Sequence, residues 1–145
     1  MLKRLMSTSD DVSLTILRVV LGVVFFAHGA QLMLGWFGGF GFHATMGFFT
    51  HTGMPAPVAF LVICAQFFGA LGLLVGLLTR IAALGIAGVM TGAIFIVHLP
   101  NGFFMNWMGT QKGEGFEFHL LALAMAAALL LRGAGAFSAD RALSK

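Results

Sequence analysis

The residues of this chain best suited to chemistry are polar side chains set within long apolar stretches. His28 and Gln31 lie three residues apart, about one helical turn, so both side chains fall on one helix face. Imidazole and amide groups donate and accept hydrogen bonds, and an imidazole also binds a proton near neutral pH. An unpaired polar group is costly inside a membrane and tends to mark function. The alternative role for this pair is to join helices by hydrogen bonds.

Other apolar stretches carry polar groups of the same kind. Gln66 lies near the middle of the second stretch, and His98 ends the third. Glu117 and His119 open the fourth, and because they are two residues apart they point to different helix faces. We expect Glu117 to be an interior proton-accepting group with His28 or His98 as its partner. Pairing or solvation at the membrane interface, without chemistry, is an equal alternative.

Haem, metal and thiol chemistry are less well supported by the residue pattern. His98 and His119 have comparable depths, as haem ligation by two histidines requires, but no local metal-ligand spacing is present. Cys64 has no second cysteine with which to form a dithiol. Nucleophile triads, phosphate loops and nucleotide fingerprints are also absent from the sequence. We therefore expect no bound haem or metal, no catalytic residue, and no turnover by this chain alone.

The elements that must position these residues are four apolar helices. The chain has 145 residues, of which 59% are hydrophobic and 9% are charged, far below the roughly 25% charged residues of soluble domains. Helices are predicted at about 14–34, 56–78, 81–99 and 116–131, the last being short for a span. The predicted fold is all-α: a polytopic membrane protein whose single domain, 1–145, is an antiparallel four-helix transmembrane bundle with aromatic outer loops.

The basic residues predict the orientation of this bundle. Only Lys112 lies on one side, whereas the others lie at the termini or in the junction between the second and third helices. Basic residues favour the cytoplasmic side, so both termini of this multi-pass membrane protein are predicted to be cytoplasmic. Because these charges lie where helices meet an anionic leaflet, no nucleic-acid partner is expected. The basic residues on the terminal side are Lys3, Arg4, Arg18, Arg80, Arg132, Arg141 and Lys145.

The outer loops and the helical hairpin carry two further patterns. Both tryptophans, Trp36 and Trp107, lie in the outer loops, where aromatic rings either anchor the chain at the interface or cover a lipid-soluble ligand. Phe42, Met46 and Phe49 follow the spacing of one face of a short interfacial helix. Glycines repeat with the same spacing in the second and third helices, which predicts close helix packing. They are Gly69, Gly72 and Gly76, and then Gly85, Gly88 and Gly92.

Four phrases in order resemble the DoxX family over nearly the whole chain. They are His28-Gly29-Ala30-Gln31, residues 35–41 (GWFGGFG), residues 76–80 (GLLTR) and residues 133–140 (GAGAFSAD). The resemblance implies a four-helix membrane protein linked to quinone-dependent oxidation of small sulfur compounds and to thiol or quinone stress, beside other redox proteins. Two features differ from many relatives: a lysine near the outer end of the first helix is missing, and Gln66 stands where a glutamate is common. A proton-linked role therefore depends more heavily on Glu117.

Together these patterns predict a membrane subunit or anchor of a quinone-coupled oxidoreductase. It would provide a quinone or lipid pocket at its outer face and hold a redox partner protein within a larger, oligomeric membrane complex. The alternative is a non-catalytic scaffold or assembly factor. A carrier is disfavoured because the helices lack a broken pair. The residues predicted to form the pocket are His28, Gln31, Trp36, Gln66, His98, Trp107, Glu117 and His119.

Overall fold

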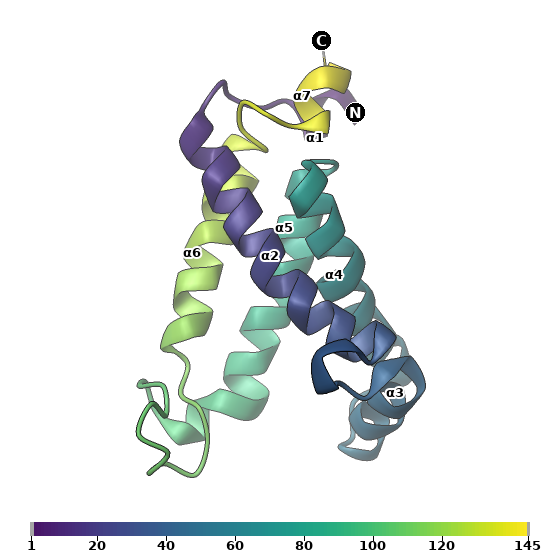
Figure 1. Cartoon of the computed structure of the whole chain (residues 1–145), viewed down its shortest axis with the longest axis vertical. Helices are drawn as coiled ribbons and strands as arrows, with labels where there is room; N and C mark the ends of the chain where they lie inside the picture. Colours follow the sequence, from purple (N-terminus) through teal and green to yellow (C-terminus); the bar gives the residue numbers. More distant parts are fainter. Residues whose placement is uncertain (1, 145) are drawn as a thin grey trace.

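The computed structural model describes residues 2–144. Met1 and Lys145 lie outside the described residues, as do the side chains of Leu2 and Arg4, so the charges counted for Arg4 and Lys145 are not placed. The described chain is entirely helical, which confirms the predicted fold class. Its four long helices are α2 (Val12–Leu34), α4 (Ala56–Val75), α5 (Thr79–Ala93) and α6 (Glu117–Arg132) (Figure 1).

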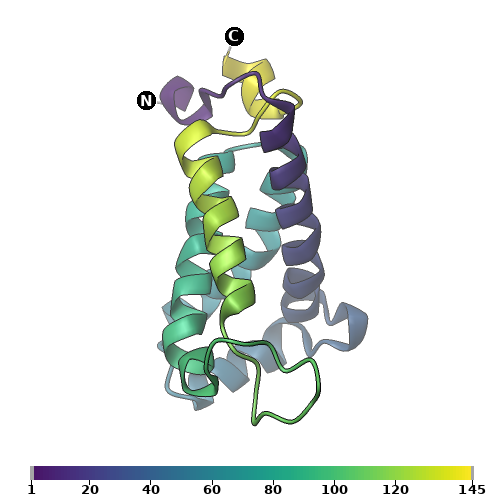
Figure 2. The same cartoon turned by 90° about the vertical axis from the view of Figure 1, so that its left-hand side faces the viewer.

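Short helical segments connect or flank these four. At the termini lie α1 (Leu2–Met6) and α7 (Ala139–Ser144), which pack side by side. At the opposite end, called the distal end below, lie η1 (Trp36–Gly38) and α3 (Gly41–His51). Helix α5 continues through η2 (Ile94–His98), a wider π turn, into η3 (Leu99–Asn101). The N-terminus and the C-terminus are at the same end in both views (Figures 1 and 2).

Within residues 2–144, three helical stretches are long and apolar enough to cross a membrane, which is one fewer than the sequence predicted. They are Val12–Leu34, Ala56–Val75 and Thr79–Asn101. Helix α6 has 16 residues and is roughly 24 Å long, short of the roughly 30 Å hydrocarbon core of a bilayer. It nevertheless packs along α5 and α2, so it completes the bundle (Figure 2).

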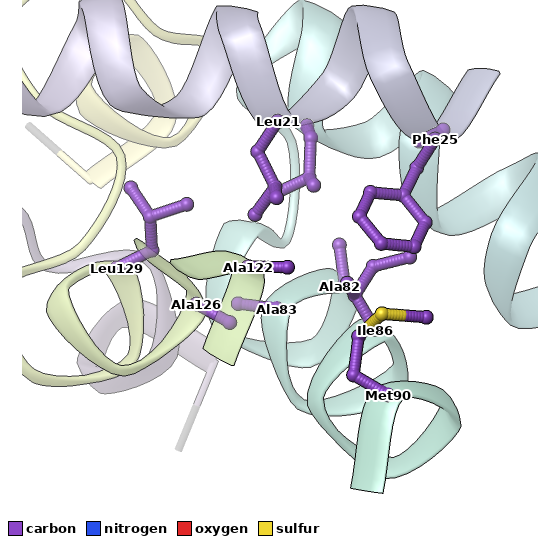
Figure 3. Packing of buried hydrophobic residues seen from close by; sticks show 11 residues of the cluster. Leu21, Phe25, Ala82, Ala83, Ile86, Met90, Ala122, Ala126 and Leu129 are labelled. Carbon is purple, nitrogen blue, oxygen red and sulfur yellow. The ribbon is translucent and has the colours of Figure 1, made fainter. Parts of the chain in front are cut away.

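Small side chains on α5 and α6 allow these helices to approach closely around a narrow core (Figure 3). Alanines from both helices face Leu21 and Phe25 of α2, so little space remains between the three helices. Large apolar side chains elsewhere on the same helices are exposed, as expected for surfaces that contact lipid. The core residues are Leu21, Phe25, Ala70, Leu73, Ala82, Ala83, Ile86, Met90, Ala122, Ala126 and Leu129.

The hairpin between α4 and α5 turns earlier than the sequence predicted. Helix α4 ends at Val75 because Gly76 adopts a left-handed conformation (φ 74°) and its N–H bonds to the carbonyl of Gly72. Thr79, predicted to lie in the link, instead begins α5. The backbone of Leu78 is also left-handed (φ 50°), which is a strained conformation for any residue with a side chain as large as that of leucine.

A carboxylate from the far end of the chain stabilises this strained turn. Asp140 is buried, and its two carboxylate oxygens accept hydrogen bonds from the backbone N–H groups of Leu78 (2.7 Å) and Thr79 (2.9 Å). These N–H groups lie at the start of α5, where no preceding helical turn supplies acceptors. Asp140 therefore acts as the N-terminal cap of a helix some 60 residues earlier, and its role was not foreseen from the sequence.

Two arginines that were interpreted as orientation signals also have structural roles. Arg18 is only 2% exposed, and its guanidinium donates to the carbonyls of Ala134 (3.0 Å), Leu74 (2.8 Å), Leu73 and Phe137 (2.6 Å). Arg80 similarly donates to carbonyls of the N-terminal segment and of α6. Both side chains therefore hold segments together at the terminal end.

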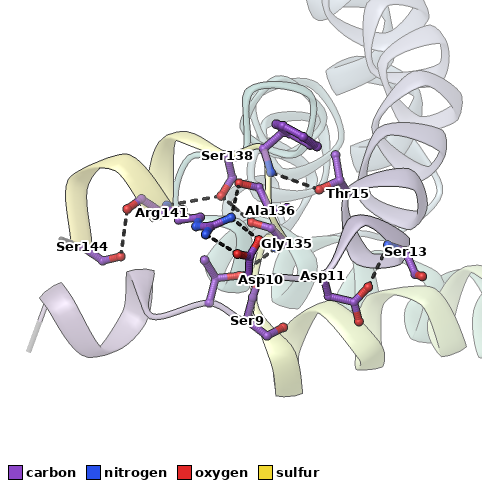
Figure 4. A network of polar contacts seen from close by, with 12 residues as sticks. Ser9, Asp10, Asp11, Ser13, Thr15, Gly135, Ala136, Ser138, Arg141 and Ser144 are labelled. Carbon is purple, nitrogen blue, oxygen red and sulfur yellow. Dashed lines mark hydrogen bonds and ion pairs between the residues drawn. The ribbon is translucent and has the colours of Figure 1, made fainter.

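The N-terminal and C-terminal segments are also joined directly (Figure 4). Arg141 forms an ion pair with Asp10, while the hydroxyls of Thr8 and Thr15 accept hydrogen bonds from the N–H groups of Gly135 (2.7 Å) and Phe137 (3.3 Å). The other basic residues with described side chains thus gather at the terminal end, as predicted, while Lys112 belongs to the loop between η3 and α6, which lies at the distal end (Figure 1). That this end faces the cytoplasm stays a prediction.

The glycine repeat of the hairpin forms close contacts over only part of its length. A Cβ at Gly85 would lie 3.2 Å from Ala65, and one at Gly69 would contact Ala82 at 3.7 Å, so α4 and α5 pack closely here. A Cβ at Gly88 or Gly92 would meet nothing within 4 Å. The predicted close packing is therefore present at Gly69 and Gly85, whereas Gly88 and Gly92 lie where the two helices diverge.

Candidate functional site

A cavity of about 900 Å³ occupies the space left by this divergence. Helices α2, α4, α5 and α6 contribute to its wall, together with the end of α3 and the loop before α6. Figure 1 shows α6 and the distal part of α5 diverging from α2 and α3 in the same region. Most lining residues are aliphatic, aromatic or glycine. The polar lining residues are His28, Gln66, His98, Glu114 and His119.

His98 and His119 form a pair at the distal end of the cavity. Their ring centroids are 4.0 Å apart and the rings are tilted by 45°. His98 lies in the π turn before Pro100, which has no N–H to continue the regular bonding of α5. Its Nδ1 lies 2.8 Å from the carbonyl oxygen of Glu114, and since a carbonyl only accepts, Nδ1 is the donor. The other ring nitrogen of a neutral His98 is then an acceptor.

His119 is the more deeply buried member of this pair. It is 6% exposed, and its Nδ1 is buried without a hydrogen-bond partner among the described residues. A buried polar atom without a partner is costly and is rarely retained in folded proteins without a functional or structural reason. His119 therefore carries unused hydrogen-bonding capacity at the wall of the cavity.

His28 and Gln66 reach the cavity because α2 and α4 cross very closely beside them. The crossing is at Gly29, where an added Cβ would lie 2.6 Å from the Cα of Phe67 and 2.7 Å from the carbonyl oxygen of Gln66. Only glycine permits this approach. The close crossing brings the exposed imidazole of His28 and the half-buried amide of Gln66 to one region of the wall.

The other predicted site residues do not line the cavity. Gln31 donates from Nε2 to the carbonyl of Phe37 (3.2 Å), and Trp36 packs edge-on against Phe26. Trp107 is 84% exposed in the loop before α6. Trp36 therefore belongs to η1 and Trp107 to the loop before α6, whereas Gln31, in the last turn of α2, bonds to η1.

Among the described residues, no hydrogen bond joins Glu117 to the predicted histidine partners. Its Oε1 accepts a hydrogen bond from the backbone N–H of Met105 (2.8 Å), so it fixes the loop between η3 and α6. The expectation of an interior proton acceptor paired with His28 or His98 is not supported by this contact. Thus four of the eight predicted residues line one cavity, and whether they bind a ligand stays a prediction.

One polar lining residue, Glu114, was missed because it lies in a loop with no helical periodicity. Its carbonyl accepts from His98 and from the Asn101 amide (3.2 Å), and its carboxylate accepts from the N–H of Asn106 (2.6 Å). The neighbouring Gly115 permits this folded loop, since a Cβ there would lie 2.4 Å from the carbonyl of Phe104. The glycines on both sides of Glu114 are the sequence feature that could have indicated this folded loop.

The geometry of the site bears on which ligands fit. A haem held by two histidines needs one imidazole on each face of the porphyrin, whereas the rings of His98 and His119 contact each other. Across residues 2–144, no group of three or more His, Cys, Asp or Glu side chains is arranged to hold a metal ion. A mostly apolar cavity with a few polar groups instead suits a lipid-soluble organic molecule.

Comparison with known proteins gives a consistent family relationship. The model of the DoxX family matches residues 13–99. A protein of Bacillus subtilis (strain 168) named "Putative oxidoreductase CatD" is 32% identical over 101 residues, which cover 70% of this chain and 71% of CatD. Inner membrane protein YqjF of Escherichia coli (strain K12) is 29% identical over 140 residues, covering 97% of this chain and 98% of YqjF. No solved structure matches the chain.

Proposed function

The chain belongs to the DoxX family of membrane proteins, and from this premise we propose that it is a membrane subunit of a quinone-linked oxidoreductase system. In this role the protein provides a binding cavity for a quinone. It lies in the bacterial inner membrane with both termini in the cytoplasm. The observation that carries the proposal is the distal cavity of about 900 Å³, with His28, Gln66, His98 and His119 in its wall.

The chemistry of the cavity supports a quinone as the ligand. Ligand cavities of roughly 300–1,000 Å³ hold molecules of the size of a substituted quinone ring with part of its tail. The oxidised ring accepts hydrogen bonds at its carbonyl oxygens, and the reduced ring donates from its hydroxyls. Imidazole and amide side chains serve both states, because each can donate and accept.

The source of electrons lies outside this chain. The sequence contains one cysteine and no nucleotide-binding fingerprint, so a partner enzyme must supply the redox group. The similar protein of Bacillus subtilis is named "Putative oxidoreductase CatD", which is consistent with a role of this kind. The joined terminal segments and their basic residues form the end of the bundle at which such a partner would bind.

The test is quinone binding by purified protein. We expect protein in mild detergent to carry extractable quinone, and His28→Ala to weaken binding of an added decyl-benzoquinone by about tenfold, the effect of one lost hydrogen bond with about 1.4 kcal/mol of binding energy. His51→Ala is the matched control, since His51 is an exposed histidine of α3 outside the cavity.

Two outcomes would refute the proposal. Wild-type protein that neither carries quinone nor binds the added probe would remove its basis. Recovery of a larger complex that is unchanged by His28→Ala and binds no quinone would instead favour the scaffold or assembly role.

A further inference from the structure

We infer that the occupant of the distal cavity is an elongated amphiphile that enters sideways from the bilayer between α4 and α5, with its polar end bound at the His98–His119 pair. This inference rests on the cavity of the proposed function but not on the occupant being a quinone. It specifies the access route, the orientation of the ligand and the residues at each end.

The shape of the cavity follows α5 for most of its length. Lining residues recur at helical spacing from Ile81, next to the hairpin, to His98 at the distal end. At 1.5 Å per residue these 17 steps correspond to roughly 25 Å. The space is therefore a long groove, which fits a chain-like molecule better than a compact ring.

The groove is open to the surrounding lipid. Leu61 of α4 and Leu84 of α5 both line it, and both are 63% exposed. Helices α4 and α5 diverge beyond Gly85, and Gly88 and Gly92 leave open space over the backbone of α5. A molecule dissolved in the membrane therefore reaches the groove without crossing the distal loops.

The polarity of the wall orients the occupant. Along α5 the wall is apolar or glycine until His98, and opposite this residue lie His119, with its unpartnered Nδ1, and Glu114. An apolar tail is favoured along the helices, and a hydroxyl or carbonyl head is favoured where imidazoles supply hydrogen bonds. The head then lies towards the membrane surface and the tail towards the bilayer centre, as in the lipids themselves.

A hydrocarbon or isoprenoid chain suits the groove better than a helix from a second copy of this chain. A helix with its side chains is about 10 Å across, whereas a single hydrocarbon chain is narrower and can lie along the roughly 25 Å of the groove.

The test fills the groove without breaking the fold. Because a Cβ at Gly88 or Gly92 meets nothing within 4 Å, the double substitution Gly88→Phe/Gly92→Phe projects two rings into open space. We expect it to weaken binding of a decyl-benzoquinone and of a decyl-phenol by about tenfold or more, while a tail-less benzoquinone is affected less. Gly47→Phe is the matched control, since Gly47 in α3 has equally open space but does not line the groove.

A second variant tests the polar end. His119→Ala should weaken both decyl probes, and His119→Gln should restore part of the affinity because its amide again donates and accepts. The comparison of His119→Ala with His119→Gln also tests the orientation of the ligand if the double phenylalanine variant is not recovered as a folded protein. Circular dichroism and gel filtration of every variant establish that the bundle is intact.

The outcomes separate this inference from the proposed function. Binding of decyl-phenol but not of the quinone, lost in Gly88→Phe/Gly92→Phe, would support the groove and refute the quinone role. Quinone binding that is the same in that variant as in Gly47→Phe would overturn the sideways route and leave the proposed function standing. A variant that turns an oligomer into a monomer, without changing binding of either probe, would assign the groove to a second copy and overturn the inference.

Discussion

Removal of the buried guanidinium of Arg18 should destabilise this protein more than removal of any exposed basic group. The substitution Arg18→Met keeps a long, flexible apolar side chain and removes only the charge and its hydrogen bonds. Those bonds join three segments, since the acceptors are Leu73 and Leu74 of α4, and Ala134 and Phe137 of the C-terminal segment.

The size of the effect follows from what the acceptors would lose. Leu73 and Leu74 lie in the last turn of α4, and the N–H groups of Leu77 and Leu78, four residues on, bond elsewhere, to Gly72 and Asp140. Arg18 is thus their partner. Each buried polar group left unpaired costs about 1–3 kcal/mol, and the carbonyls of Leu73 and Leu74 are two such groups. We expect a loss of about 3–5 kcal/mol, a large share of the roughly 5–15 kcal/mol that stabilises a typical protein.

The lone cysteine provides the assay. Cys64 lies half-buried near the middle of α4 and becomes reactive towards a fluorogenic thiol reagent when the bundle unfolds. Titration with SDS in mixed micelles then gives the free energy of unfolding. Arg132→Met is the control, because Arg132 is exposed and its loss should cost less than about 1 kcal/mol. Equal stabilities of the two variants would show that the Arg18 contacts contribute no net stability.

Two further effects are expected from the same packing. Asp140→Ala should lower the unfolding free energy by about 1–3 kcal/mol, because two N–H groups at the start of α5 lose their acceptor. Asp10→Ala is the control, since it removes an exposed ion pair worth about 1 kcal/mol or less. SDS titration measures the unfolding free energy of both variants. Gly29→Ala should cost about 1–3 kcal/mol by pushing Phe67 and α4 away from α2, while Gly47→Ala should not lower the thermal midpoint; equal midpoints would contradict the close crossing.

The positive charges of this chain have two kinds of role. Lys3 and Arg132 are exposed at the terminal end and are available to an anionic leaflet, as the orientation argument assumes. Arg18 and Arg80 instead donate to backbone carbonyls. A count of basic residues on each side therefore combines orientation signals with groups that hold the bundle together.

The sequence by itself determined the helical elements and much of their arrangement. Long apolar stretches must form helices in lipid, where each backbone polar group needs an internal partner. The spacing of Phe42, Met46 and Phe49 predicted α3, and these three residues are half-buried on the same side as the buried Thr45, while Phe48 is exposed. These features depend on neighbours within a few turns, so local pattern was enough to find them.

Only the tertiary structure decided which polar residues share a site. His28, Gln66, His98 and His119 come together because α4 and α5 diverge beyond Gly85, and that divergence depends on side chains from several helices.

The terminal contacts show the same dependence on distant partners. Arg18 binds carbonyls 116 residues away, and Asp140 caps a turn 62 residues earlier. Helical period fixes the direction of a side chain from its own axis, whereas the group it meets depends on how separate helices cross. The spacing of residues within one helix therefore does not predict how that helix crosses its neighbours.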